Sequence, residues 1–257
     1  MYSVERRSQV CQRIMEMARD DKRLAAGALV GSTASGGDRW SDIDITFSVV
    51  EGVPVTSVIT DWTNRMRHEF NAVYLLDLPV QSTIYRVYLL PGNLQVDLSF
   101  TPQNDFAPRS PKFTLFFGNA KEAILPKPPS ARELFGYAIL YLLSARISIE
   151  RGRYWQAEYL ISGGRDYLLA LACRVHGLKT AYGKGFDQLP SEITKPFVST
   201  LVRSLDRNEL LRALRITIDQ LRINSKYAED TSLGSLESQL HELQKDTLTE
   251  QNDVTET

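Results

Sequence analysis

The sequence predicts an α+β fold, in which a mixed β-sheet with helices is followed by an α-helical bundle. Segments that alternate polar and apolar residues, as half-buried strands do, all lie in the first half of the chain. Beyond residue 130, every periodic segment has the spacing of an amphipathic helix. Between the halves, the prolines of 126–129 neither continue a helix nor fit a central strand. The chain is therefore expected to contain two domains of different class.

Two helices and five strands are expected in the first half. The first helix covers residues 4–18, where apolar residues such as Ile14 recur at helical spacing, and the second contains Trp62 and Met66 on one face. The expected strands cover residues 26–30, 42–50, 72–80, 83–90 and 94–101. Pro91-Gly92-Asn93 favours a tight turn, so the last two strands are expected to form an antiparallel hairpin.

Only helices are expected in the second half. Ser130 is a suitable N-cap for the first of them, because Glu133 stands three positions later as in a capping box. The expected helices cover residues 130–150, 154–176, 192–205 and 209–224. The whole chain is then expected to comprise a catalytic domain (1–125), a proline-rich linker (126–130), a helical domain that binds acceptor and nucleotide (131–225), and an acidic, partly disordered tail (226–257).

Composition excludes several classes of protein. With 257 residues, 43% hydrophobic and 24% charged, the chain is typical of globular proteins and long enough for two cores. No apolar run is long enough for a membrane span, and no signal peptide is evident, so a cytoplasmic protein without a membrane partner is expected. Cys11 and Cys173 have no metal-ligand spacing and suit a reducing compartment. The net charge of −1 gives no strong signal for nucleic-acid binding.

One motif stands out, in which Gly31-Ser32 is followed after a spacer by Asp42-Ile43-Asp44. Residues two apart on a strand point to the same face, so Asp42 and Asp44 share one side of the sheet. Asp97 occupies the polar face of a later strand that alternates in the same way. If the two strands are neighbours, three carboxylates converge, and such a cluster needs a cation to neutralise it. Carboxylate oxygens are ligands that Mg²⁺ prefers, together with water and phosphate oxygens.

The Gly31-Ser32 pair adds a means of binding phosphate. Glycine lets the backbone approach a phosphate closely, and the serine hydroxyl and the next backbone amides can donate hydrogen bonds to it. On a strand, an Asp-x-Asp pair alone is more often a solvated sheet face. The combination of both motifs with a third aspartate favours a site for a metal and a nucleotide.

These residues resemble the nucleotidyltransferase superfamily typified by DNA polymerase beta. With its helical second half, the chain is most similar in plan to the antibiotic nucleotidyltransferases, resistance enzymes that act on aminoglycosides or lincosamides. The motif covers residues 29–45 and Asp97, and the domain plan covers roughly the whole chain. The resemblance implies that Asp42, Asp44 and Asp97 are catalytic and hold two Mg²⁺ ions. It also implies that Gly31 and Ser32 bind the triphosphate.

Three further candidates lie in the helical half. The segment around Glu158 resembles the element with which such enzymes supply a general base, so Glu158 is a candidate to accept the proton of the acceptor hydroxyl. Arg165, two helical turns later, is a candidate to pair with Glu158 or with a nucleotide phosphate. Lys184, in a glycine-rich loop, is a third candidate for contact with a phosphate. For Glu158 and Arg165, an ordinary surface side chain is at least an equally valid interpretation, and for Lys184 a solvated loop lysine is the default one.

The expected function is a Mg²⁺-dependent nucleotidyltransferase that moves a nucleoside monophosphate from a nucleoside triphosphate to a hydroxyl of a small, antibiotic-like molecule and releases pyrophosphate. ATP is the expected nucleotide. Two alternatives remain open: an enzyme of this type that modifies a protein or RNA, as in toxin–antitoxin systems, and a catalytically silent nucleotide-binding protein of the same fold. Both a monomer and a homodimer remain possible. Residues 131–225 carry a net charge of +5 and residues 226–257 one of −6, which favours a neutral or weakly charged acceptor.

Overall fold

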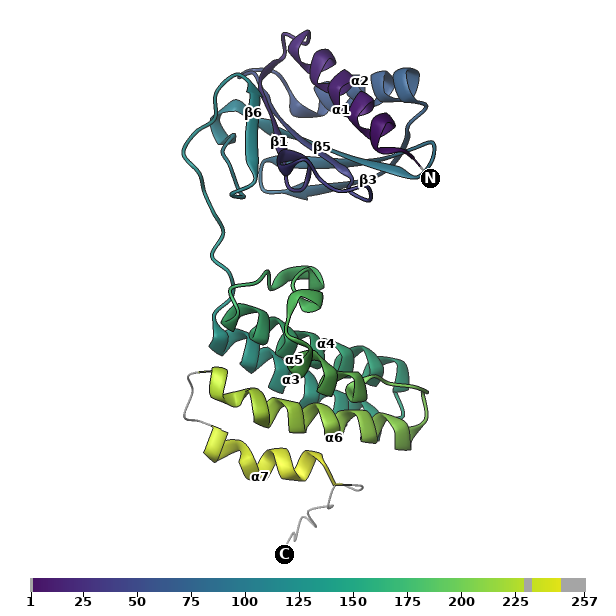
Figure 1. Ribbon diagram of the computed structural model, residues 1–257, viewed down its shortest axis with the longest axis vertical. Coiled ribbons are helices and arrows are strands. Elements are labelled where there is room, and N and C mark those ends of the chain that lie inside the picture. Colours follow the sequence, from purple (N-terminus) through teal and green to yellow (C-terminus); the bar gives the residue numbers. More distant parts are fainter. Residues whose placement is uncertain (1, 229–232, 246–257) are drawn as a thin grey trace, which may run out of the picture. The chain divides into compact units, whose positions relative to one another are not determined.

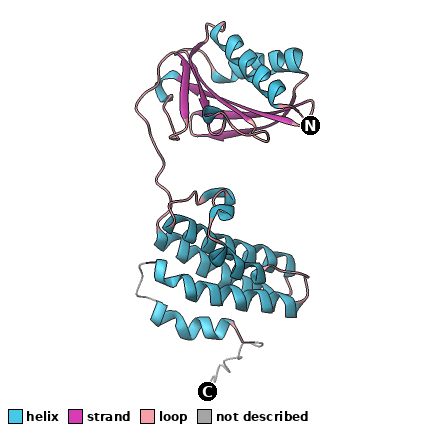
Figure 2. Ribbon diagram, in the orientation of Figure 1, coloured by secondary structure: helices cyan, strands magenta, loops and turns pink. Residues whose placement is uncertain are grey.

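A six-stranded mixed sheet forms in the first half of the chain, and helices form the second half (Figures 1 and 2). The computed structural model describes residues 2–228 and 233–245. The chain divides into two units, Met1–Lys127 and Pro128–Thr257, and the boundary between them falls inside the proline-rich segment. The α+β class predicted from the sequence is confirmed.

The sheet of the first unit has the order β3-β4-β5-β2-β1-β6. Its strands are β1 (Leu24–Val30), β2 (Ile43–Val49), β3 (Val73–Val80), β4 (Thr83–Leu90), β5 (Leu94–Pro102) and β6 (Phe113–Phe117). Neighbouring strands are antiparallel except for β2 and β5, which are parallel. The expected hairpin of β4 and β5 is confirmed, and its turn uses positive φ angles at Gly92 (84°) and Asn93 (64°).

Two helices, α1 (Val4–Arg19) and α2 (Val55–Phe70), cover one face of the sheet (Figure 1). Trp62 and Met66 of α2 and Ile14 of α1 are fully buried in this core. Alternate residues of β2 and β5, such as Ile43 and Val96, point into the same core. The polar residues between them therefore face the opposite side of the sheet.

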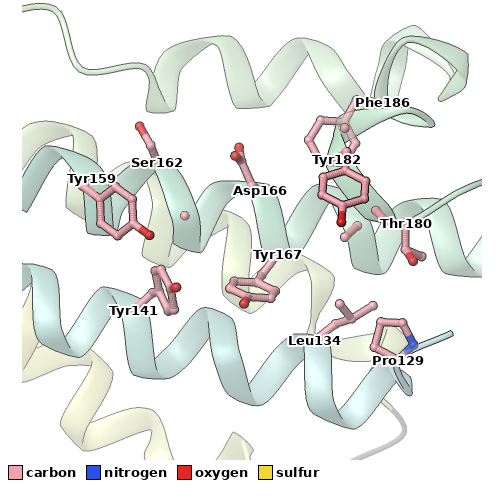
Figure 3. Close-up of a pocket in the computed structure, with 14 residues that line it drawn as sticks. Pro129, Leu134, Tyr141, Tyr159, Ser162, Asp166, Tyr167, Thr180, Tyr182 and Phe186 are labelled. Carbon is pink, nitrogen blue, oxygen red and sulfur yellow. The ribbon is translucent and has the colours of Figure 1, made fainter. Parts of the chain in front are cut away.

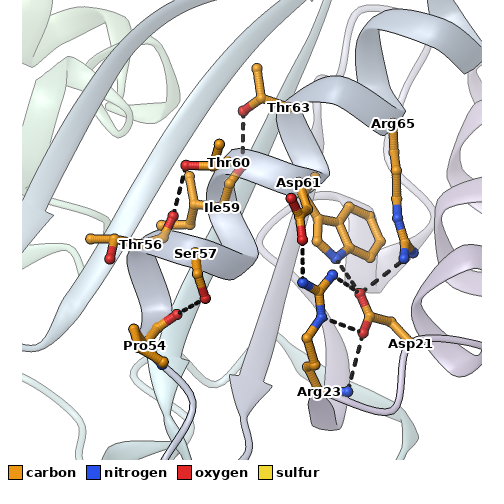
Figure 4. Close-up of polar contacts among 11 residues, drawn as sticks. Asp21, Arg23, Pro54, Thr56, Ser57, Ile59, Thr60, Asp61, Thr63 and Arg65 are labelled. Atoms are coloured by element: carbon orange, nitrogen blue, oxygen red, sulfur yellow. Dashed lines mark hydrogen bonds and ion pairs between the residues drawn. The ribbon is translucent and has the colours of Figure 1, made fainter.

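A buried carboxylate connects the start of β1 to α2 (Figure 4). Asp21 accepts hydrogen bonds from Arg23 Nη2 at 2.8 Å and from Trp62 Nε1 at 3.1 Å, and Arg65 Nη1 lies 3.4 Å away. Arg23 also pairs with the exposed Asp61. Burial by itself would raise the pKa of Asp21, but the hydrogen bonds and charges of the two arginines outweigh it and lower this pKa to about 2.

The second unit is built on three long helices, α3, α4 and α6, which share one hydrophobic core. Its α-helices are α3 (Ala131–Glu150), α4 (Tyr154–Val175), α5 (Ser191–Thr194), α6 (Arg207–Asn224) and α7 (Leu233–Leu243). The expected capping box forms at the start of α3, where the side chains of Ser130 and Glu133 each bond to the other's backbone N–H. None of the helices in the described residues has the length and apolar character needed to cross a membrane.

One helix expected for this unit is wrong, and one helix of this unit, α7, was not expected. The continuous helix expected over 192–205 is wrong, because α5 ends at Thr194 and a 3₁₀ segment, Lys195–Thr200, follows it. Pro196 has no N–H for an α-helical hydrogen bond, which explains the break. Part of the tail predicted to be partly disordered is helical, since α7 forms and its Leu240 is buried in the core. The disorder expected for 246–257 concerns residues outside those the structure describes.

Candidate active site

Three carboxylates meet on the polar face of the sheet, near the starts of β2 and β5. Asp42 comes directly before β2, and Asp44 pairs in register with Asp97 of β5. The expectation that these two strands lie side by side is confirmed. One carboxylate oxygen from each aspartate lies within 4.8 Å of the others, and all three residues are half-buried. A single cation can therefore contact all three side chains.

The chain between β1 and β2 is held against these carboxylates by Thr33. Its Oγ1 donates a hydrogen bond to the backbone oxygen of Asp42 at 3.2 Å and accepts one from the N–H of Asp44 at 2.9 Å. Ser32 Oγ lies at hydrogen-bonding distance, 3.4 Å, from Asp42 Oδ1. Sequence reasoning missed Thr33, although its place directly after Gly31-Ser32 marks it as a polar residue of the same turn.

Gly31 is required by the geometry of this turn. Its φ of +60° lies in the left-handed region, which residues with a Cβ rarely adopt. A Cβ at this position would lie only 2.8 Å from Asp44 Oδ2. Glycine therefore leaves the space that the Asp44 carboxylate occupies, and the four motif residues Gly31, Ser32, Asp42 and Asp44 form one local structure.

The surroundings of Asp97 raise the pKa of its carboxyl group. Burial raises its pKa above the ordinary value, the negative charge of Asp42 raises it further, and two hydrogen bonds from Gln95 Nε2 at 3.1 Å offset part of the effect. The positive charge of a divalent cation would counteract both effects. The donor set, three carboxylates with no nitrogen or sulfur ligand among the described residues of the cluster, fits Mg²⁺.

We expect Asp97→Asn to stabilise the metal-free protein at pH 7 and to abolish its stabilisation by Mg²⁺. Because the pKa of Asp97 is raised by folding, its contribution to stability is present at low pH and lost as the pH rises through the folded-state pKa. The uncharged asparagine removes this penalty and also removes one metal ligand. Thermal unfolding with and without MgCl₂ measures both effects, with Asp105→Asn as control. An unchanged response to Mg²⁺ in Asp97→Asn would contradict the metal site.

A cavity of about 270 Å³ continues from Asp44 and Gly31 along the same face of the sheet. Its floor is rich in hydroxyl groups, because Thr46, Ser99 and Thr101 follow the aspartates at intervals of two residues on β2 and β5. Thr83 and Tyr85 of β4 also line it, as do residues of the segment from Asp105 to Phe113, the first residue of β6. Hydroxyl groups beside a carboxylate cluster that can hold a cation suit a ligand with many oxygen atoms.

The three candidates of the helical half all lie in the second unit. Glu158 Oε1 accepts a hydrogen bond from Ser162 Oγ at 2.8 Å. In the described part of the chain Arg165 pairs with Asp166, at 3.2 Å, and not with Glu158, which was one of its two predicted partners. Lys184 is exposed, with its Nζ 6.0 Å from the centre of the Tyr182 ring. Their roles remain sequence-based predictions.

Sequence reasoning also missed a larger cavity, of about 610 Å³, in the second unit (Figure 3). Tyr141 of α3 and Tyr159 and Tyr167 of α4 line it, and the rings of Tyr141 and Tyr167 lie 5.1 Å apart. Gly163 allows this packing, since a Cβ there would lie 2.4 Å from the Tyr141 ring. The polar groups of Ser162 and Asp166 reach the same cavity.

No protein-family model matches the sequence, and no curated protein is significantly similar to it. Among solved structures, the chain is similar to an aminoglycoside 6-adenyltransferase from Bacillus subtilis, with 13% identity and a TM-score of 0.40 over 95% of this chain and 99% of that one. It is also similar to a nucleotidyltransferase-like protein from Exiguobacterium sibiricum 255-15, with 12% identity and a TM-score of 0.37 over 91% of this chain and 88% of the other.

Proposed function

We propose that this protein is a Mg²⁺-dependent nucleotidyltransferase, which transfers a nucleoside monophosphate from a nucleoside triphosphate to a hydroxyl group of a small molecule. The observation that carries the proposal is the convergence of Asp42, Asp44 and Asp97 beside the Gly31-Ser32 turn. A group of carboxylates that holds divalent cations next to a turn that can bind phosphate is the apparatus that phosphoryl-type transfer needs.

Each part of the site has a distinct role in this reaction. Asp42, Asp44 and Asp97 would hold Mg²⁺, which when bound neutralises charge on the phosphates and lowers the barrier to attack. Ser32 and the backbone N–H groups of its turn would donate hydrogen bonds to phosphate oxygens. The acceptor oxygen forms a bond to the α-phosphorus, the bond from that phosphorus to the β-phosphate bridging oxygen breaks, and pyrophosphate leaves. Glu158 is the proposed acceptor of the hydroxyl proton.

The tyrosine-lined cavity supports an acceptor that contains rings and has little charge. Tyr141, Tyr159 and Tyr167 offer ring faces and hydroxyl groups, which suit the flat apolar faces and hydroxyls of a cyclic molecule. The carboxylate of Asp166 already pairs with Arg165, so the cavity offers little attraction for several ammonium groups. The net charge of +5 over residues 131–225 acts in the same direction.

The test is transfer of label from nucleotides to defined acceptors. The protein is incubated with MgCl₂ and each of α-labelled ATP, GTP, CTP and UTP, with panels of neutral, singly charged and multiply charged hydroxylated ring compounds. We expect labelled acceptor and an equal amount of pyrophosphate, with neutral or singly charged acceptors preferred. Label on protein or RNA instead would overturn the small-molecule acceptor, and no transfer from any nucleotide would overturn the proposed activity. A preference for multiply charged acceptors would overturn the acceptor class alone.

A further inference from the structure

Two cationic residues that sequence reasoning did not select lie beside the Gly31 turn. Strand β6 pairs with β1, with Phe113 opposite Val30, so the residues before β6 run alongside the turn that follows β1. The backbone oxygen of Lys112 accepts a hydrogen bond from Gly31 N–H at 3.1 Å. Lys112 Nζ donates to Ser35 Oγ, also at 3.1 Å. The Lys112 ammonium group is therefore held against the outer end of this turn.

Arg109, three residues earlier, lines the 270 Å³ cavity that Gly31 and Asp44 also line. It is half-buried, and within the residues that the structure describes its guanidinium group has no hydrogen bond or ion pair. Two other half-buried arginines of this unit, Arg23 and Arg86, each form an ion pair with an aspartate. A guanidinium group presents up to five N–H donors, so an anion that enters the cavity would find a matching partner there.

The segment that carries both residues is anchored at its two ends. Phe106 is buried and packs against Phe113, with ring centres 5.8 Å apart. The backbone oxygen of Pro108 accepts a hydrogen bond from Ile124 N–H at 2.8 Å. Pro108 and Pro111 also fix their own φ angles on either side of Arg109. Binding an anion would therefore cost little ordering of the backbone.

We propose that Arg109 and Lys112 bind the β- and γ-phosphates of the nucleotide and then the departing pyrophosphate. This inference rests on the proposed function. Even with two bound divalent cations, the three carboxylates and a triphosphate together leave an excess of negative charge. Cationic side chains near the phosphates would offset this excess. Arg109 supplies a planar fork that matches phosphate oxygens, and Lys112 supplies a point charge at the turn that would hold the other end of the phosphate chain.

The test compares binding of three probes, Mg·ATP, Mg·pyrophosphate and AMP, by isothermal titration calorimetry on the full chain. We expect Arg109→Ala and Lys112→Ala each to weaken Mg·ATP and Mg·pyrophosphate about tenfold or more, while AMP binding stays within about twofold. Arg109→Lys should recover part of the loss, because it keeps the charge but not the fork. Arg13→Ala is the matched control, since Arg13 is an exposed arginine of α1, on the opposite face of the sheet, paired with Glu69.

The outcomes distinguish failure of the phosphate-binding role of Arg109 and Lys112 from failure of the proposed nucleotidyl transfer. If the wild type binds Mg·ATP and pyrophosphate and both alanine variants bind them equally well, the phosphate role of Arg109 and Lys112 is overturned while the proposed function stands. Equal losses for AMP and pyrophosphate would also overturn that role, because they would indicate a general disturbance of the site. Wild-type protein that binds neither Mg·ATP nor pyrophosphate overturns both. Lys112→Glu is a second variant, at an exposed position where the substitution does not disturb packing. Its loss of affinity for Mg·ATP and Mg·pyrophosphate should exceed that of Lys112→Ala.

Discussion

Replacing Asp44 with asparagine is expected to reduce nucleotidyl transfer by at least about a thousandfold, since metal-based stabilisation of transition-state charge is worth several kcal/mol. Asp44 is in register with Asp97, and its backbone N–H donates a hydrogen bond to Thr33 Oγ1. Asparagine keeps the size of the side chain but not its charge. The rate of transfer from labelled nucleotide under single-turnover conditions measures the loss.

The control for this prediction is Asp105→Asn, which removes one negative charge from the same cavity outside the metal cluster. We expect this variant to keep its rate within a few-fold of the wild type. Thermal unfolding should show that both variants remain folded. Retention of substantial transfer by Asp44→Asn, or an equal loss in Asp105→Asn, would show that the three-aspartate cluster is not the metal site.

Substitution of the buried Asp21 is expected to have a large effect on the stability of the first unit. Asp21→Asn should lower the free energy of unfolding of the first unit by about 3 kcal/mol, because Arg23 and Trp62 then lose a buried charged acceptor. Asp61→Asn removes the other, exposed partner of Arg23 and should cost no more than about 1 kcal/mol. Urea unfolding followed by the fluorescence of the fully buried Trp62 measures both. Equal effects of the two substitutions would contradict the role of the Asp21 network.

The same network predicts a dependence on pH. The pKa of Asp21 is about 2 in the folded protein and near 4 in the unfolded chain, so its ionisation favours folding above the unfolded value. This contribution, about 2 kcal/mol, is lost as the pH falls from about 5 toward 2. Asp21→Asn should therefore lose less stability than the wild type over this range, and the difference between the two should shrink.

Much of the candidate site could be predicted because its chemistry is local in sequence. Gly31 and Ser32 directly follow β1, Asp42 directly precedes β2 and Asp44 lies in it, and the two-residue spacing of the aspartates already places both carboxylates on one face. Asp97 required one further assumption, that β5 lies next to β2. The alternation of each strand was visible in the sequence, whereas their parallel pairing depends on the packing of α1 and α2 against both.

The residues that sequence reasoning missed act through contacts between distant segments. Phe113–Phe117 contains a single polar residue, Thr114, and so lacks the sustained alternation that predicts a half-buried strand. Without β6, nothing places Arg109 or Lys112 beside Gly31. The tyrosine-lined cavity likewise depends on the close approach of α3 to Gly163 of α4. The apolar periodicity predicted both helices, but it does not indicate which residues of α3 and α4 line a cavity between them.

The sequence by itself determined the α+β class, the position of the proline-rich boundary and the two-residue spacing that aligns Asp42 with Asp44. These follow from backbone periodicity and from the restricted backbone angles of proline and glycine, which act within a few residues. The tertiary structure alone decided that Asp97 meets the other two carboxylates and that Arg109 and Lys112 border the Gly31 turn. These depend on strand order and helix packing, which are set by the burial of the whole apolar surface rather than by any local pattern.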